Sequence, residues 1–150
     1  MKTTFLRLVM PILLLVCFTG CNEEEEKMLD GGTALTWEKC EGLQLGKNYT
    51  VADIPAEGIS YSLVCTNAWK DTIWLQSVKI DGQSLTIEKD EDKQLPLSVE
   101  GEWGKVVCEG KNLHITIAPS NYITERVIEI KPTQIGCFYT FTFTQAPVKK

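Results

Sequence analysis

Short segments in which apolar and polar residues alternate dominate this sequence after residue 33. Residues 59–66, ISYSLVCT, alternate Ile, Tyr, Leu and Cys with Ser, Ser, Val and Thr. In residues 136–144, Cys137, Tyr139, Phe141 and Phe143 share one face, and Thr140, Thr142 and Thr144 lie on the other. A period of two is the pattern of a half-buried β-strand. No segment keeps a helical period over eleven residues, so strands have to supply the core.

The remaining expected strands are equally short and are bounded by turn residues. They lie at residues 33–37, 48–51, 72–80, 84–88, 95–99, 104–109, 112–118 and 125–131. Asp81-Gly82 predicts a two-residue hairpin turn, and Gly110-Lys111 predicts a second hairpin. Pro96 lacks a backbone donor, which favours a sheet edge for residues 95–99.

This strand pattern predicts an all-β fold, a single antiparallel β-sandwich over residues 33–147. Sandwich domains have about 100 residues, so this segment suits one of them. A parallel α/β sheet is excluded, because the helices that would connect its strands are missing from the pattern.

The first twenty residues have the pattern of a signal peptide. Lys2 and Arg7 precede an apolar run at residues 8–18. Eleven helical residues span about 16 Å, which is too short for a membrane core of about 30 Å. The following Phe18-Thr19-Gly20-Cys21 resembles the lipobox of bacterial lipoproteins. We therefore predict lipid attachment at Cys21, the alternative being an ordinary signal peptide followed by an unmodified cysteine.

An acidic run, Glu23 to Glu26, follows Cys21. Like charges repel each other and keep a segment extended, so residues 21–32 are predicted to form an acidic tether. The run also resembles the surface-export signal of lipoproteins in Bacteroidota. It predicts a lipid-anchored protein of the outer membrane that is exposed at the cell surface or else faces the periplasm.

The charged residues argue against several classes of function. The chain carries 15 basic and 20 acidic residues, and it has no basic patch that would bind nucleic acid. Its single histidine, His114, could serve a hydrolase with Ser120, but nothing in the pattern activates a nucleophile. Residues 88–93 are acidic but lack the ligand spacing of a calcium loop, and no CxxC motif is present. We therefore predict a non-enzymatic protein without a cofactor or a bound metal.

Four cysteines follow the predicted tether: Cys40, Cys65, Cys108 and Cys137. An even number of cysteines in an exported chain predicts disulfides, and four cysteines allow three pairings. Cys65 and Cys137 also lie on the apolar faces of their strands, where cysteine packs as a small core residue. Both interpretations stay open.

Aromatic residues are the candidates for a binding surface. Trp74 shares its strand parity with core positions, and Trp103 is also expected to pack. Trp69 and Tyr122 lie in polar loops, where their rings could stack on the apolar faces of sugars. Isolated exposed aromatic residues are also common without any such role.

Two further residues carry weaker signals. Arg126 alternates with Ile128 and Ile130, where it could anchor an acidic sugar, pair with a carboxylate or extend its charged end to solvent. The tripeptide Asp71-Thr72-Ile73 looks like the O-glycosylation acceptor of exported Bacteroidota proteins, which makes Thr72 a candidate modification site.

The order of motifs resembles that of BACON-type domains. Residues 54–69 contain a Gly before an alternating strand that ends in a polar pair and Trp69. Trp103, residues 113–117 and 126–130, and a final strand ending in Thr-Gln follow in the same order over residues 50–146. An additional hairpin over residues 71–99 departs from the family pattern. The resemblance implies an immunoglobulin-like β-sandwich of surface proteins that binds carbohydrate or mucin glycans, or that serves as a spacer.

Together these observations predict a surface lipoprotein with a non-catalytic binding module for glycans. Its expected partners are the membrane, through lipid on Cys21, and a glycan or another outer-membrane protein. The alternative is a structural or protein-interaction subunit of an outer-membrane system without sugar binding.

Overall fold

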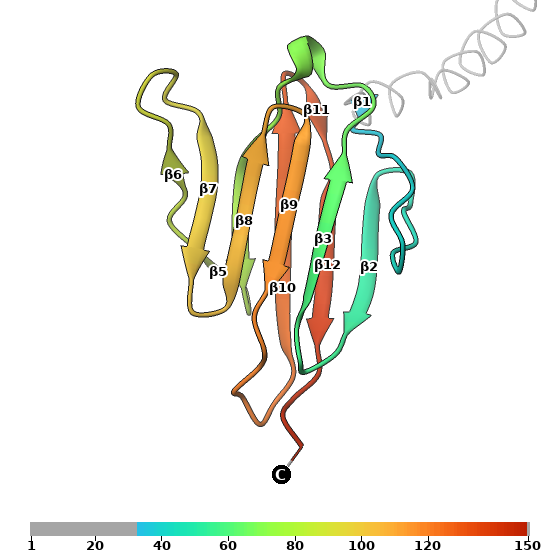
Figure 1. Ribbon diagram of the computed structural model, residues 1–150, viewed down its shortest axis with the longest axis vertical. Helices are drawn as coiled ribbons and strands as arrows, with labels where there is room; N and C mark the ends of the chain where they lie inside the picture. The colour runs from blue at the N-terminus through green and yellow to red at the C-terminus, as the bar shows by residue number, and fades with distance from the viewer. Residues whose placement is uncertain (1–32, 150) are drawn as a thin grey trace, which may run out of the picture. The chain divides into compact units, whose positions relative to one another are not determined.

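Two β-sheets pack against each other in the computed structural model, which describes residues 33–149. The strands run side by side, and their connections gather at the two ends of the domain (Figure 1). The described residues contain no α-helix and one 3-10 turn, η1 (Trp69–Asp71). The predicted signal peptide, Cys21 and the tether lie outside the described residues.

The first sheet is built around β10, the longest strand. It consists of β1 (Thr33–Ala34), β2 (Tyr49–Ile54), β4 (Trp74–Ile80), β5 (Gln83–Ser84), β10 (Arg126–Gln134), β11 (Cys137–Phe138) and β12 (Thr140–Gln145). β10 pairs antiparallel with β12 on one side and with β4 on the other. β4 leads into β5, while β1 and β2 extend the sheet beyond β11 and β12.

The second sheet is antiparallel throughout, in the order β3-β9-β8-β7-β6. Its strands are β3 (Ile59–Val64), β6 (Glu88–Lys89), β7 (Pro96–Gly101), β8 (Gly104–Glu109) and β9 (Asn112–Ile117). The predicted hairpin between β8 and β9 is confirmed, with Glu109 opposite Asn112.

The strand order is that of an immunoglobulin-like sandwich. Strands B, E and D of that fold share one sheet, and strands C, F and G share the other. Here β3, β9 and β8 occupy the first set of positions, and β4, β10 and β12 occupy the second. The strands β5, β6 and β7 are additional to these six, and they lie between β4 and β8 in the chain. The predicted all-β sandwich is therefore confirmed.

One edge differs from the antiparallel expectation, because β1 and β2 run parallel to β11 and β12. The chain leaves β2 through a short turn and enters the opposite sheet as β3. β2 thus pairs with the last strand of the domain instead of with its neighbour in sequence. Alternation of residues defines a strand and its buried face, but it does not define the direction of a distant partner.

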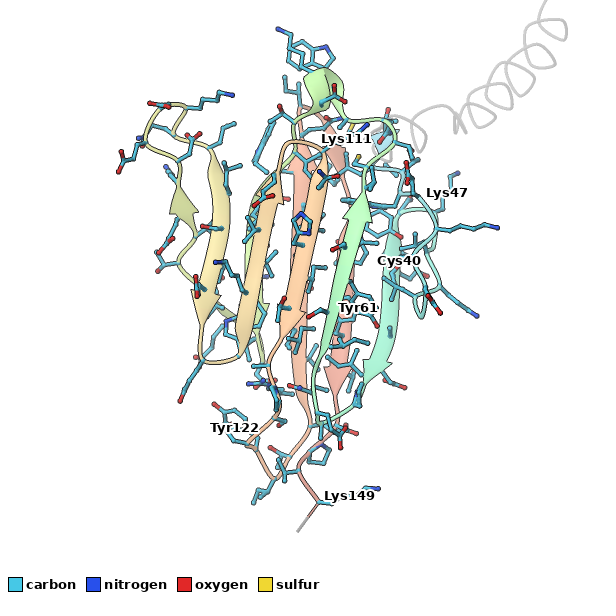
Figure 2. The ribbon with its side chains drawn as sticks, in the orientation of Figure 1. Cys40, Lys47, Tyr61, Lys111, Tyr122 and Lys149 are labelled. Atoms are coloured by element: carbon cyan, nitrogen blue, oxygen red, sulfur yellow. The ribbon has the colours of Figure 1, made fainter. Side chains whose placement is uncertain are left out.

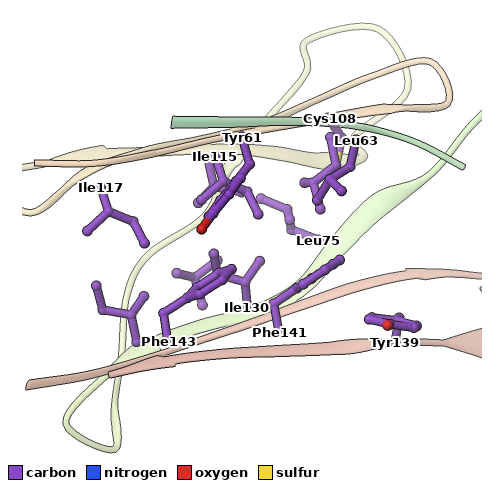
Figure 3. Packing of buried hydrophobic residues seen from close by; sticks show 14 of the residues in the cluster. Tyr61, Leu63, Leu75, Cys108, Ile115, Ile117, Ile130, Tyr139, Phe141 and Phe143 are labelled. Carbon is purple, nitrogen blue, oxygen red and sulfur yellow. The ribbon is translucent and has the colours of Figure 1, made fainter. Parts of the chain in front are cut away.

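The predicted inner faces form the core between the sheets. Tyr61, Leu63 and Cys65 of the first long alternating segment are buried. Phe141 and Phe143 are fully buried opposite them, and the Tyr61 and Phe143 rings stack with centroids 5.6 Å apart. Figure 3 shows this contact joining β3 to β12, so side chains from both sheets interdigitate as in other sandwiches.

A β-bulge in β4 overturns the prediction that Trp74 lies in the core. Ser77 pairs with Lys131, but the next pair joins Leu75 to Pro132, so β4 contains one additional residue at that point. The bulge reverses the parity of the strand, because successive side chains point to opposite faces. Leu75 is completely buried as a result, and Trp74 is only half-buried outside the core cluster.

The Asp81-Gly82 turn forms the predicted hairpin, with both residues at positive φ (49° and 79°) and Ile80 opposite Gln83. The predicted strand at residues 84–88 does not continue, because the chain crosses to the other sheet and forms β6 there. The expectation that Pro96 marks a sheet edge is also wrong. Pro96 begins β7, which pairs with β8 on one side and with the two-residue β6 on the other.

Candidate functional site

A pocket of about 400 Å³ lies at the end of the sandwich where β4, β7 and β9 end and β10 begins. We call this the pocket end. Ile80 and Leu85 contribute apolar surface, Trp103 comes from the β7–β8 turn, and Tyr122 and Arg126 come from the start of β10 and the loop before it. Tyr122 lies at the lower left of the view in Figure 2. Ligand pockets range from about 300 to 1,000 Å³, so this one can hold a small organic molecule.

Arg126 is the most unusual residue of the pocket, because its side chain is charged and only 5% exposed. Arg126 shares its strand parity with Ile128 and Ile130, and all three residues are buried. Its Nε donates a hydrogen bond to Oε1 of Gln145, 2.7 Å away, while Nη2 has no partner among the described residues. Burying a cation without a paired anion is costly, so this position calls for a compensating group.

Gln145 holds Arg126 and the neighbouring loop together. It is completely buried at the end of β12 and lies opposite Arg126 in the strand register. Its Nε2 donates to the carbonyl oxygen of Ala118 at 2.8 Å, while its Oε1 accepts the Arg126 bond. Both ends of the amide are therefore used, and the guanidinium is held in one place.

Tyr122 covers Arg126 from the solvent side. The Arg126 Cζ atom lies 5.2 Å from the centroid of the Tyr122 ring, within the range of a cation–π contact. The Tyr122 backbone makes two hydrogen bonds: its N–H donates to Ser120 Oγ, and its carbonyl accepts from the Val148 N–H. Tyr122 is nevertheless 49% exposed, so part of its surface is free to contact a ligand.

Trp103 forms part of the pocket wall with a buried ring whose Nε1 donor has no partner among the described residues. The turn before β8 needs a glycine at position 104. The backbone φ of Gly104 is 137°, and a Cβ there would collide with the Thr116 carbonyl oxygen. This close approach packs the β7–β8 turn onto β9 and so positions the indole.

The two glutamates of the pocket wall differ in how their charges are balanced. Glu100 forms an ion pair of 2.9 Å with Lys105, and this contact raises the pKa of Lys105. Glu102 is exposed. Neither carboxylate approaches Arg126 within the 4.0 Å of an ion pair in the described part of the chain.

The other predicted aromatic residue lies far from this pocket. Trp69 belongs to η1, at the opposite end of the sandwich, which we call the Trp69 end (Figure 1). Trp69 is 57% exposed, and Lys70 Nζ lies 4.4 Å from the centroid of its ring. Gln134 supports this turn by accepting a bond from the Trp69 N–H and donating one to the Asn67 carbonyl. Trp69 and Tyr122 therefore cannot belong to one small-ligand site.

The candidate O-glycosylation residue Thr72 and the four candidate disulfide cysteines all lie within the described residues. Thr72 is partly exposed and donates a hydrogen bond from Oγ1 to the Lys70 carbonyl at 3.0 Å. The four cysteines are free thiols: Cys40, Cys65, Cys108 and Cys137. Cys65 and Cys108 are buried, which raises the pKa of both thiols, that of Cys108 to about 12.

His114 does not lie near Ser120. Its Nδ1 is 3.1 Å from the hydroxyl of Ser62, which stands opposite it in the β3–β9 register, and its Nε2 is 3.7 Å from Glu109. These three side chains lie on the outer face of the sheet, and none of them lines the pocket. This is the cross-strand pairing expected of exposed polar residues.

No group of three or more His, Cys, Asp or Glu residues among residues 33–149 is placed to hold a metal ion. Within the same range, no helix is long and apolar enough to cross a membrane.

Comparison with known proteins supports the fold. The chain is similar to an NMR structure of a protein from Bacteroides thetaiotaomicron, with a TM-score of 0.60 and 23% sequence identity. The similarity covers 78% of this chain and 90% of the other. No family model and no curated protein matches the chain. At this identity the comparison shows a shared fold and nothing further.

The sequence indicated part of this pocket. Tyr122 was a candidate and Arg126 stood out by its parity, but neither Ile80 nor Leu85 carried any sign of a site. Trp103 was expected only to pack, and its unpaired indole donor depends on contacts from other strands. Such a wall forms from segments distant in sequence, so no local pattern could reveal it.

Proposed function

We propose that this chain is a non-catalytic glycan-binding module and that its ligand occupies the pocket end. The observation that carries the proposal is a half-exposed tyrosine ring beside a buried arginine in a pocket of about 400 Å³. Aromatic rings offer flat apolar surface at little entropic cost, and a few fixed polar groups give orientation. Sugars present both kinds of surface, apolar C–H faces and hydroxyl groups.

The proposal is tested by a glycan array probed with the wild-type protein and Tyr122→Ala. We expect binding of a limited set of glycans and loss of that signal in Tyr122→Ala. Tyr49→Ala is the matched control, because Tyr49 is 64% exposed on β2 and does not line the pocket. Equal loss in the two variants, or no glycan bound by the wild type, contradicts the proposal.

The proposed location is the outer membrane, with lipid on Cys21 and the acidic tether holding the domain at the cell surface. The leader pattern and the lipobox resemblance support this part. Labelling of cells with a fatty-acid analogue tests it: the wild type should be labelled, and Cys21→Ala should not be. Labelling that persists in Cys21→Ala overturns the anchor.

A protein-interaction subunit is the second candidate, favoured by the edge strand β2. Among the described residues β2 pairs only through its β12 side, and its Tyr49 and Val51 side chains are both 64% exposed. Exposed edge strands can add a strand from a partner. Copurification of a defined outer-membrane protein that is lost on Val51→Pro, with glycan binding absent, would favour this function over the first.

A further inference from the structure

We infer that the pocket end recognises a carboxylate, and that its ligand is an acidic sugar whose carboxylate pairs with Arg126. This inference rests on the proposed function and specifies the class of glycan. Arg126 differs from the lysines of the described domain because none of them is buried. Lys79, Lys105, Lys111 and Lys131 each pair with an acidic side chain at the surface, and the other described lysines are exposed to water. Arg126 is 5% exposed and pairs with no acidic side chain among the described residues.

Burial of the Arg126 guanidinium costs folding free energy, and no acidic side chain among the described residues offsets this cost. Positions 128 and 130 on the same face of β10 are isoleucines with no exposed surface. An apolar residue at position 126 would continue this face and avoid the cost of removing a cation from water. Replacing buried ionic groups with apolar residues is often neutral or stabilising for folding. The position of Arg126 in the wall of a pocket therefore points to a ligand.

The geometry of the guanidinium specifies the charge it should meet. Its five donors form a planar fork that matches the two oxygens of a carboxylate. Only one donor, Nε, is engaged by Gln145, and Nη2 has no partner among the described residues. Gln145 fixes the fork, so little side-chain entropy remains to be lost when an anion binds.

The surrounding residues favour a sugar acid over a more highly charged ligand. The Tyr122 ring offers a face for sugar C–H groups, and the Trp103 indole lies in the same wall with an unpaired donor. Glu100 and Glu102 also line the pocket. Their carboxylates can accept hydrogen bonds from hydroxyl groups, and they repel a dianion such as a phosphate ester about twice as strongly as a monoanion. A monoanionic carboxylate accompanied by hydroxyl groups satisfies all of these residues.

The test compares two ligands that differ only at the relevant group. Methyl β-D-glucuronide carries a carboxylate where methyl β-D-glucoside carries a hydroxymethyl group. Isothermal titration of the full-length protein should show the glucuronide binding roughly tenfold or more tightly, the gain expected for a hydrogen-bonded ionic contact. The preference should shrink as salt is added, because screening weakens a charge contact.

Substitutions of single residues then test whether Arg126 causes the preference for the glucuronide. Arg126→Met should remove the preference for the glucuronide, and Arg126→Lys should restore only part of it, because an ammonium group lacks the fork. Lys131→Met is the matched control, since it removes one cation from the same strand outside the pocket. It should keep the full preference. Circular dichroism of each variant establishes that it is folded.

A measurement on the wild type keeps the test decisive if Arg126→Met does not fold. The chain contains only one other arginine, Arg7, so the Nε–H signal of Arg126 can be followed by NMR. The glucuronide should shift that signal and the glucoside should not. A glucuronide that leaves the signal unchanged overturns the inference.

The remaining outcomes separate the inference from the proposed function. Equal binding of the two glycosides, with both lost in Tyr122→Ala, overturns the carboxylate preference and leaves glycan binding intact. Tighter binding of glucose 6-phosphate than of the glucuronide overturns the assignment to a carboxylate. No binding by any of these sugars, together with a glycan array without signal, overturns both.

Discussion

The two ends of the sandwich carry similar residues in different arrangements. Each has an exposed aromatic ring, a cation near that ring and a buried glutamine at the end of a strand. At the Trp69 end, Lys70 lies on the surface and Gln134 bonds two backbone groups. At the pocket end, Arg126 is buried and Gln145 bonds one backbone group and one charged side chain.

The difference shows that an exposed aromatic residue beside a cation does not define a binding site. Exposed cation–π pairs contribute little, and the Trp69 end uses its polar groups to hold its own turn. The pocket end keeps a charged group buried without a partner anion among the described residues. It also differs in position, because the B–C and F–G loops that bind ligands in antibody domains correspond to the Trp69 end. The pocket lies at the opposite end.

The largest effect should come from the two buried glutamines. Gln145→Leu leaves the Arg126 Nε donor and the Ala118 carbonyl unpaired, and we expect it to lower the free energy of unfolding by about 3 kcal/mol. Gln134→Leu leaves only neutral groups near the surface without a hydrogen-bond partner. It should therefore lower the free energy of unfolding by about half as much. Urea unfolding measures both values. Equal losses would mean that Arg126 is not held as a buried charge.

A smaller effect should separate the two aromatic residues. We expect Trp69→Ala to leave glycan binding unchanged, while Tyr122→Ala weakens it about tenfold, as aromatic contacts in a binding site do. Both variants should change the free energy of unfolding by no more than about 0.5 kcal/mol, because both rings are exposed. Titration with a glycan identified on the array measures the first quantity. Loss of binding in Trp69→Ala would move the site to the other end.

The domain should lose stability at alkaline pH because of a thiol buried outside the pocket end, since burial raises the pKa of Cys108, which does not line the pocket. In the folded state the pKa of the Cys108 thiol is about 12, whereas in the unfolded chain it is near the ordinary value of 9.0. Stability is therefore unaffected below pH 9 and falls between pH 9 and 12. At pH 10 the loss from Cys108 should be about 1 kcal/mol.

Urea unfolding between pH 8 and 10.5 measures this loss, with Cys108→Ala as the comparison. Burial also raises the pKa values of Cys65, Tyr61 and Tyr139, so the variant should retain a shallower dependence of the same sign. An identical slope in the wild type and in Cys108→Ala would contradict the raised pKa of that thiol.

Alternation along single segments was sufficient to predict the long strands and most of the core, but not the short strands β5 and β6. The inward positions of β3, β9 and β12 followed from their period of two, and the Asp81-Gly82 turn followed from residues that tolerate positive φ. These features depend on neighbours in sequence. The same reasoning failed at Trp74, because one additional residue in β4 reverses the parity without changing the composition of the segment.

The sequence by itself determined an all-β chain, most of its buried faces and the shared parity of Arg126 with Ile128 and Ile130. Only the tertiary structure decided that β2 runs parallel to β12, that Trp69 and Tyr122 lie at opposite ends, and that Arg126 lines a pocket with Trp103. The physical reason is the range of the interactions involved. Local steric and hydrophobic preferences act over a few residues, whereas a pocket is formed where strands distant in the chain end together.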